Sequence, residues 1–292
     1  MDLPPAASPL AILEPAFVVA RPLHQSAPVV FVSAHSGRDY PAAFIADARL
    51  DPLSLRRSED SFVDELFAAA PSLGVPLLSA TFPRAFCDAN REKWELDPAM
   101  FEDALPPWVN TTSSRVGAGL GTIARMVGSG EAIYRHKLPW AEAERRLESL
   151  WQPFHDALQE LIATTCRHFG ACLVIDCHSM PSPGAAPRAA CDMVLGDAHG
   201  TACSPHAIRR MEQALAGMGY SVRRNDPYAG GYITRHYGRP RDRVHALQLE
   251  ISRALYMDEA AITPLAGFAK LQANMTTLMQ GLMEQPDRLG LT

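Results

Sequence analysis

The sequence of 292 residues lacks an excess of basic residues, a long apolar run and a low-complexity segment. Its 27 Lys and Arg residues are outnumbered by 32 Asp and Glu residues, so the formal net charge is −5 and nucleic acid is not an expected partner. No stretch approaches the about 18 to 20 apolar residues that span a bilayer, so no membrane partner is expected. With 47% hydrophobic residues, the composition is typical of a globular protein, which excludes disordered and fibrous proteins.

Cys-x-x-Cys pairs are also absent, although the chain has 6 cysteines. In a chain of this size we expect them to be small buried residues in a reducing compartment, not a disulfide framework. Prolines at positions 4, 5, 9 and 15 interrupt the apolar character of the start, where no charged segment precedes an apolar run. We therefore expect no signal peptide and a cytoplasmic location.

Short apolar runs alternate with longer amphipathic segments, which is typical of an α/β domain with helices packed against a sheet. Pro153 is expected to kink or split one of the helices. The irregular segment 96–130 is expected to be either a functional or a disordered loop. No linker or repeat divides the chain, so residues 1–27 are expected to be an N-terminal extension and 28–292 a single catalytic domain. The expected strands are 29–34, 75–80, 172–177, 193–196, 220–224 and 246–251, and the expected helices are 60–70, 141–168, 205–218 and about 264–284.

Two of the apolar segments end in a histidine that is followed by a serine. Segment 29–34 leads into His35, and segment 172–177 leads into His178. Ligands of α/β proteins gather beyond the carboxyl ends of strands, so both imidazoles are candidates for a site there. Another apolar run contains Glu250, and such a carboxylate is costly unless it is paired, bound to metal or catalytic. Each residue alone is equally explained as a hydrogen-bonded structural histidine or a solvent-facing glutamate.

Glu59 and Asp60 offer a third ligand for a metal held by these histidines. Two histidines and a carboxylate leave an open position for water on a zinc ion, and a separate glutamate can then transfer protons. The alternative for both acids is the cap of a helix that begins there.

Asn90 and Arg91 follow the expected strand 75–80 and suggest a clamp for an acidic substrate. The guanidinium is a planar fork that suits a carboxylate, and the amide adds a donor and an acceptor. The alternative is that Asp88 and Arg91 pair on the surface.

The order of these motifs over about residues 28–284 resembles the N-formylglutamate amidohydrolase family. The motifs are His35-Ser36-Gly37 with Tyr40-Pro41, Glu59-Asp60 with Val63-Asp64-Glu65-Leu66, Asp88-Ala89-Asn90-Arg91, Asp176-Cys177-His178-Ser179-Met180, Gly230-Gly231-Tyr232-Ile233-Thr234, and Gln248-Leu249-Glu250-Ile251 with Leu255-Tyr256-Met257-Asp258.

The resemblance implies a fold similar to the zinc carboxypeptidases, with three layers and a central, mostly parallel or mixed sheet flanked by helices. It also implies hydrolysis of an N-formyl or N-acyl amide of an acidic amino acid, with N-formyl-L-glutamate giving formate and L-glutamate in histidine degradation. One Zn²⁺ per chain is implied. The implied metal ligands are the imidazoles of His35 and His178 and the carboxylate of Asp60, with Glu59 as the alternative. The implied general base and acid is Glu250. The implied clamp for the substrate α-carboxylate is Asn90 with Arg91.

One position departs from the zinc carboxypeptidases, which place a glutamate three positions after the first histidine. Arg38 occupies that position here, and a cation cannot bind zinc. The carboxylate must come from elsewhere, and Asp60 is preferred because it precedes segment 63–66 as in the family pattern.

Further residues are expected to act around the metal. Arg84 is expected to stabilise the developing oxyanion, while Glu250 accepts a proton from water and passes it to the departing amine. Asp176 could orient His178 from behind. The remaining candidates bind substrate or line its pocket: Ser179, Tyr232 closing from a mobile loop, and Tyr134 and Arg135, for which packing is the alternative.

Other functions compete with this hypothesis. Ser36 or Ser179 could be a hydrolase nucleophile, although the chain lacks a Gly-x-Ser-x-Gly elbow. Another N-acyl amino acid as substrate, or a non-catalytic binding protein of the same fold, are further alternatives. No sequence feature sets the oligomeric state. The cation for the substrate side chain is left open among Arg115, Arg125, Arg135, Arg235 and Arg239.

Overall fold

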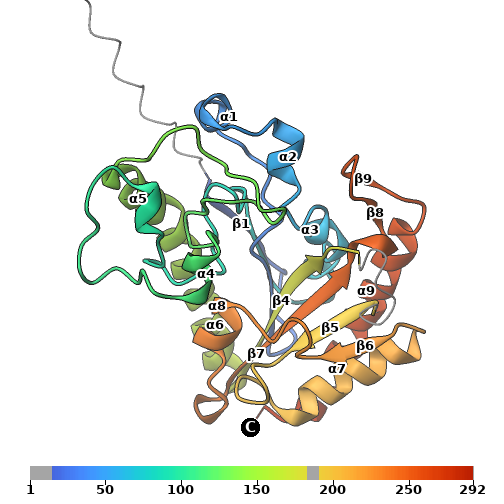
Figure 1. The fold of residues 1–292 in the computed structure, drawn as a ribbon. Coiled ribbons are helices and arrows are strands. Elements are labelled where there is room, and N and C mark those ends of the chain that lie inside the picture. Colours follow the sequence, from blue (N-terminus) through green and yellow to red (C-terminus); the bar gives the residue numbers. More distant parts are fainter. Residues whose placement is uncertain (1–14, 183–190, 292) are drawn as a thin grey trace, which may run out of the picture.

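The computed structural model describes residues 15–182 and 191–291, and it is built around one mixed sheet with the strand order β1-β3-β2-β4-β7-β5-β6 (Figure 1). β3, β2, β4 and β7 run parallel to one another, whereas β1 and β5 are antiparallel to their neighbours β3 and β7. The strands are β1 (Phe17–Ala20), β2 (Val29–Ser33), β3 (Leu77–Ala80), β4 (Cys172–Met180), β5 (Met193–Gly196), β6 (Val222–Arg224) and β7 (Val244–Ser252). A separate hairpin pairs β8 (Met257–Asp258) with β9 (Thr263–Pro264).

Helices cover both faces of this sheet, which gives three layers (Figure 1). Val30 and Val32 of β2 pack in the same core as α6, whereas Val29 and Phe31 pack in the core of α7 and α9. Because both faces of the central strands are buried, β2 and the first half of β4 are continuous apolar runs, whereas β7 also buries Gln248 and Glu250. The helices are α1 (Ala42–Asp47), α2 (Pro52–Arg56), α3 (Val63–Leu66), α4 (Ser114–Gly117), α5 (Trp140–Arg146), α6 (Gln152–Phe169), α7 (Pro205–Gly217), α8 (Tyr232–Tyr237) and α9 (Phe268–Glu284).

The predicted α/β fold with a mixed central sheet is confirmed, and all six predicted strands are present. β3 starts at Leu77 because Pro76 has no N–H for the ladder. β1 was not predicted. It lies within residues 1–27 and pairs with β3, so the described part of that segment contributes the edge strand of the same sheet.

Two predicted helices are wrong in extent. In 60–70 only Val63–Leu66 is α-helical, because Phe62 adopts a left-handed conformation with φ of 68°. The C-terminal helix starts at Phe268, not near 264, because Pro264 belongs to the hairpin with Met257.

The predicted helix 141–168 is present as α5, a π-helical turn at Leu147–Trp151 and α6. The π-helical turn directly precedes Pro153, so the helical path continues past a residue that cannot donate an N–H. None of the helices in the described ranges is long and apolar enough to cross a membrane.

Candidate active site

Four chemically active side chains meet at the carboxyl ends of the parallel strands. His35 follows β2, His178 lies near the end of β4, and Glu250 in β7 is its direct partner across the two strands. Asp60 precedes α3, and its backbone N–H donates to the carbonyl of His35 at 3.0 Å. This edge of the sheet is where α/β proteins bind ligands.

The turn that carries His35 depends on a glycine. A Cβ on Gly37 would lie 2.1 Å from the carbonyl oxygen of Phe82, closer than real atoms approach. Only glycine therefore allows the chain after His35 to pass this close to the segment that follows β3.

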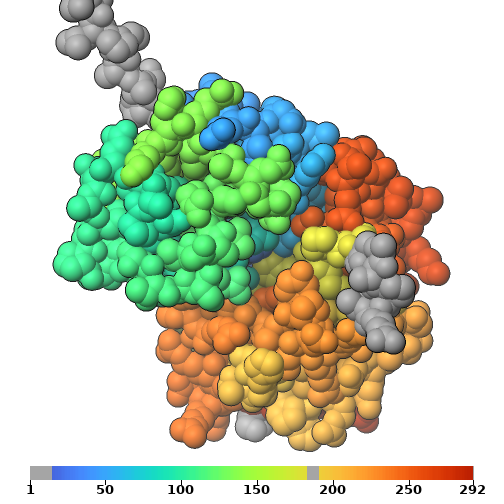
Figure 2. Space-filling view, viewed as in Figure 1, coloured from blue at the N-terminus to red at the C-terminus, as the bar shows by residue number. Residues whose placement is uncertain are grey.

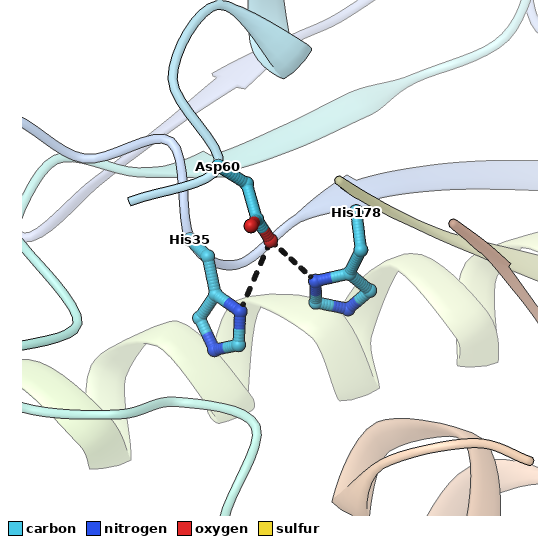
Figure 3. A group of neighbouring side chains, drawn as sticks. All are labelled: His35, Asp60 and His178. Carbon is cyan, nitrogen blue, oxygen red and sulfur yellow. Dashed lines mark hydrogen bonds and ion pairs between the residues drawn. The ribbon is translucent and has the colours of Figure 1, made fainter. Parts of the chain in front are cut away.

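His35, Asp60 and His178 form a compact buried group (Figure 3). Asp60 Oδ2 lies 2.8 Å from Nδ1 of His178 and 3.3 Å from Nδ1 of His35. One potential ligand atom from each residue lies within 4.8 Å of the others. The structure thus brings together the three residues for which the sequence predicted a metal site.

The other nitrogen of each imidazole faces a second carboxylate. His35 Nε2 lies 2.7 Å from Oδ1 of Asp88, and His178 Nε2 lies 2.9 Å from Oδ2 of Asp176. Such a carboxylate fixes the orientation of the ring and makes the other nitrogen of the same imidazole a stronger metal ligand. Asp176 therefore occupies the orienting position that the sequence suggested.

Asp60 is held by further polar contacts on its second oxygen. Ser179 Oγ donates to Asp60 Oδ1 at 3.1 Å, and Arg253 Nη2 donates to the same oxygen at 3.2 Å. Burial opposes the charge of Asp60, but the hydrogen bonds with His178 and His35 outweigh it and hold its pKa well below the usual range. The carboxylate is therefore ionised in the fold, as a metal ligand must be.

Glu59 does not join this group. Its carboxylate accepts hydrogen bonds from Arg56 Nε at 3.1 Å and from Ser61 Oγ at 2.9 Å. Of the two acids between which the sequence left the choice open, only Asp60 faces the histidines.

The donor set fits a divalent metal ion. Two imidazole nitrogens and one carboxylate oxygen are a common ligand set for catalytic zinc, which keeps a further position open. The group is buried beside Asp88 and Asp176, so a cation there would offset several negative charges. Asp60, His35 and His178 could therefore hold the ion, with Asp88 and Asp176 orienting the imidazoles.

A cavity of about 350 Å³ opens onto this group. Figure 2 shows the surface hollowed between the green segment, which includes residues 115–128, and the orange segment, which includes residues 227–235. The predicted irregular segment 96–130 thus contributes to the cavity wall. The cavity has more cationic than anionic side chains, since six arginines line it beside Asp60, Asp88 and Glu250. The arginines are Arg57, Arg84, Arg91, Arg115, Arg235 and Arg253.

Glu250 lies in the cavity wall beside the metal group. Burial raises the pKa of its carboxyl to about 7, which is a suitable value for a general base near neutral pH. Gln248 Nε2 donates to Glu250 Oε1 at 2.6 Å, and Gln248 Oε1 accepts from the Gly231 N–H at 2.7 Å. This chain of contacts fixes the carboxyl against the loop before α8.

The chain matches the family model described as N-formylglutamate amidohydrolase over residues 27–257. The chain belongs to this family. A related protein is the N-formylglutamate deformylase of Pseudomonas aeruginosa, 33% identical over 230 residues that cover 77% of this chain and 80% of the relative. The N-formylglutamate deformylase of Pseudomonas putida is 29% identical over 237 residues, covering 80% of this chain and 82% of the relative.

Solved structures give the same result. An N-formylglutamate amidohydrolase from Ralstonia eutropha JMP134 matches with a TM-score of 0.88 and 39% identity, covering 93% of this chain and 98% of that chain. A gene product of Agrobacterium tumefaciens shares the fold, with a TM-score of 0.62 and 20% identity over 92% of this chain and 94% of that chain. This member of the N-formylglutamate amidohydrolase family is therefore a hydrolase that acts on an amide.

In this amidohydrolase, Arg84 and Arg91 flank Asp88 at the cavity. Arg84 Nη2 donates to Asp88 Oδ2 at 3.0 Å, and Arg91 Nη2 lies 3.7 Å from the same oxygen. Burial opposes ionisation of Asp88, but Arg91 and His35 outweigh it and keep its pKa well below the usual range. Asp88 and Arg91 do interact, yet both are buried beside the metal group and not on the surface.

Asn90 is largely occupied by the protein itself. Its Nδ2 donates to Asp176 Oδ2 at 3.0 Å, and its Oδ1 accepts from the N–H of Ile233 at 2.8 Å. Although Asn90 lines the cavity, these contacts tie it to β4 and α8. Ser179 likewise lines the cavity while its hydroxyl contacts Asp60 and Arg253.

Tyr232 is placed differently from the expectation. It begins α8 instead of lying on a loop, and its ring packs 4.7 Å from that of His236 and 5.8 Å from that of Trp151. The described tyrosine that lines the cavity is Tyr228. Burial and the nearby charge of Glu250 raise the pKa of its hydroxyl, so Tyr228 lies in the electrostatic field of the predicted base.

Tyr134 and Arg135, for which a role in the pocket and a role in packing were both open, contact other parts of the protein. Tyr134 accepts a hydrogen bond from Arg146 at 2.7 Å and packs against Phe44, and Arg135 Nε donates to the carbonyl of Ala48 at 2.9 Å. Neither Tyr134 nor Arg135 is among the described residues that line the cavity, which favours the packing alternative.

Among the described residues, neither of the two candidate serine nucleophiles is paired with a histidine. Ser36 Oγ pairs with Ser33 and accepts from the N–H of Asp64 at 3.2 Å. Both nitrogens of His35 and of His178 face carboxylates, so within the described residues neither imidazole is directed at a serine hydroxyl. This arrangement does not provide the serine–histidine pair that a serine hydrolase requires.

Sequence reasoning missed three residues of the site: Asp88 as the partner of His35, Arg253, and Gln248. Asp88 and Gln248 stood within recognised motifs, so their position was a usable signal. Arg253 follows β7 and reaches Asp60 across the chain, and no local pattern indicates such a contact.

Proposed function

We propose that this enzyme hydrolyses the formamide bond of N-formyl-L-glutamate and releases formate and L-glutamate, with one Zn²⁺ held by His35, Asp60 and His178. The observation that carries the proposal is the buried two-histidine, one-carboxylate group that opens onto a cationic cavity beside Glu250. The names of the relatives support the substrate.

Zinc, when bound, supplies a Lewis acid that polarises a carbonyl and makes water nucleophilic near neutral pH. In our proposal, Glu250 accepts a proton from water while the oxygen of that water forms a bond to the formyl carbon. Arg84 donates to the carbonyl oxygen as negative charge develops there. The C–N bond then breaks, and Glu250 passes its proton to the departing α-amine, so atoms and charge balance.

Substrate binding follows from the same residues. Burial lowers the pKa of Arg91 to about 10, so its guanidinium stays charged at neutral pH. We propose that Arg91 binds the α-carboxylate, while Asn90 holds His178 and α8 in place beside it. Ser179 fixes Asp60, and Tyr228 borders the bound substrate.

The six cysteines are free thiols, which suits the reducing cytoplasm in which we propose the enzyme acts. Histidine degradation, which the family resemblance implies, is the proposed source of its substrate.

The substrate is tested by formate release from N-formyl-L-glutamate, N-formyl-L-aspartate and N-acetyl-L-glutamate by the purified, zinc-loaded protein. We expect the largest kcat/KM for N-formyl-L-glutamate. Faster hydrolysis of the acetyl compound would overturn the formyl assignment, and no turnover of any of the three would reject the proposed substrate class.

A further inference from the structure

The arginines of the cavity fall into two groups. Arg84 and Arg91 share Asp88 as a partner, and Arg253 donates to Asp60, so each of these three already contacts a carboxylate of the protein. The guanidiniums of Arg57, Arg115 and Arg235 contact no carboxylate in the described part of the chain, although all three line the cavity. Cations left unbalanced beside a site for an acidic substrate are candidates for its second carboxylate.

The structure also reduces the number of candidates for the cation that binds the substrate side chain, which the sequence left open among five arginines. Arg125 is neutralised by Asp97, to which its Nε donates at 2.6 Å. Arg135 and Arg239 are not among the described residues of this cavity. Arg115 and Arg235 are therefore the ones with access to the substrate.

The backbone of Arg115 is tied to Arg91 through Leu120. Arg91 Nε donates to the carbonyl of Leu120 at 3.0 Å, and the Leu120 N–H donates to the carbonyl of Arg115 at 2.8 Å. Ser113 caps α4 by accepting from the Val116 N–H at 3.1 Å. The position of Arg115 is thus set relative to the proposed clamp for the α-carboxylate.

The two charges also act on each other. Burial is the largest cause that lowers the pKa of Arg91, and the negative charge of Asp88 opposes it. The positive charge of Arg115 lowers the pKa of Arg91 further. Two positive charges that act on each other are unfavourable until an anion binds beside them. A substrate such as N-formyl-L-glutamate, with one carboxylate on Cα and a second at the end of its side chain, would supply an anion to each guanidinium.

Arg235 and Arg57 lack this relation to Arg91. Arg235 Nε donates to the carbonyl of Gly230 at 3.1 Å on the opposite wall, and the carbonyl of Arg57 accepts from Arg253 at 3.1 Å beside Asp60. Both add to the positive potential of the cavity. α8, which carries Arg235, contacts Asn90 through the Ile233 N–H, but no hydrogen bond of Arg235 itself in the described residues reaches a group that contacts Arg91.

We propose that Arg115 binds the side-chain carboxylate of the substrate and thereby selects acidic over neutral N-formyl amino acids. The proposal rests on the proposed function for the identity of the reaction, but the recognition of a second carboxylate can be measured without turnover. Arg115 is a specificity-determining residue in this account and takes no part in bond breaking.

The test compares N-formyl-L-glutamate with N-formyl-L-glutamine, which has a similar shape and no side-chain charge. We expect Arg115→Gln to lower the ratio of kcat/KM for the two substrates by about 10-fold or more, because a charge-assisted pair is lost. Arg115→Lys should restore part of the ratio. Arg241→Gln, on an exposed residue outside the cavity lining, is the matched control and should keep the wild-type ratio.

Calorimetric binding of L-glutamate and L-glutamine to the same zinc-loaded proteins separates this proposal from the proposed function. A selective loss of L-glutamate affinity in Arg115→Gln supports the role of Arg115 even if no formate is released by the wild-type enzyme. An unchanged preference for L-glutamate, or an equal loss for both amino acids, would overturn it. If the wild-type enzyme releases no formate but binds L-glutamate selectively, and Arg115→Gln loses that selectivity, only the proposed reaction is rejected.

Discussion

Replacing Glu250 by Gln separates proton transfer from the other roles of this position. The amide has nearly the same shape in a site where Glu250 is buried, and its Oε1 can still accept from Gln248 Nε2. It cannot accept a proton from water or return one to the amine. Because general acid–base catalysis contributes about 10² to 10⁴ in rate, we expect kcat to fall by that factor, or about 3 to 5 kcal/mol in barrier.

The free energy of unfolding should rise in Glu250→Gln, whereas kcat falls. Burial raises the pKa of Glu250 from 4.5 to about 7, so the unfolded chain releases this proton at lower pH than the folded protein. The contribution of Glu250 to stability therefore falls as pH rises from 4.5 to 7, and it is lost above pH 7. The shift corresponds to roughly 3 kcal/mol, so Glu250→Gln should be more stable than wild type at pH 8 by up to that amount.

Formate release measures the loss of kcat, and urea unfolding of both metal-free proteins at pH 8 measures the gain in stability. Zinc content is the third measurement, and it should be the same in Glu250→Gln as in wild type. Glu65→Gln, at a half-buried position outside the cavity lining and paired with Arg38, is the control and should leave kcat unchanged. Near-normal turnover of Glu250→Gln would refute its role as the base. Loss of zinc from the variant would instead show that Glu250 supports the metal site.

Further predictions concern the residues around the metal and the fold that carries them. Asp88→Asn should weaken zinc binding by about 10- to 100-fold in a chelator competition, because the amide orients His35 less strongly; equal affinity would exclude that role. Burial lowers the pKa of His155 to about 3, so only the unfolded chain gains its proton near pH 6.5, and stability is lost as pH falls below that value. Urea unfolding should show about 2 kcal/mol of this loss at pH 5 in wild type and none of it in His155→Phe. Gly37→Ala should lower both Tm and kcat because its Cβ would meet the Phe82 carbonyl, whereas the control Gly281→Ala, with open space around its Cβ, should not.

The central strands were predictable because their physical cause is local. β2 and the first half of β4 are buried on both faces and appear as continuous apolar runs, and β7 is an apolar run interrupted by Gln248 and Glu250. The polar residues at their ends, His35 and His178, stood out for the same reason. β1 escaped prediction because it is a short edge strand of partly exposed residues.

The helix predicted over 60–70 failed because a tertiary contact overrides the local pattern. The chain must present Asp60 to two histidines, and it turns through a left-handed Phe62 before only one helical turn forms. The choice between Glu59 and Asp60 depends on this turn, which composition does not specify. The ambiguity therefore disappears only when the backbone path is known.

Contacts between distant segments were not predictable from sequence. Arg253 reaches Asp60 across 193 positions, and Arg91 contacts the carbonyl of Leu120 within an irregular segment. Exposure of Tyr228 and packing of Tyr232 are decided by where α8 begins. Such roles depend on the register of strands and the path of loops, for which no short motif exists.

The most direct test of the account measures the zinc content of the purified protein by elemental analysis together with formate release from N-formyl-L-glutamate. We expect about one zinc per chain, loss of formate release on chelation and its return when zinc is restored. Formate release that persists in a fully metal-free protein, or a chain that binds no transition metal even after reconstitution, would contradict the assignment of His35, Asp60 and His178 as the catalytic metal site.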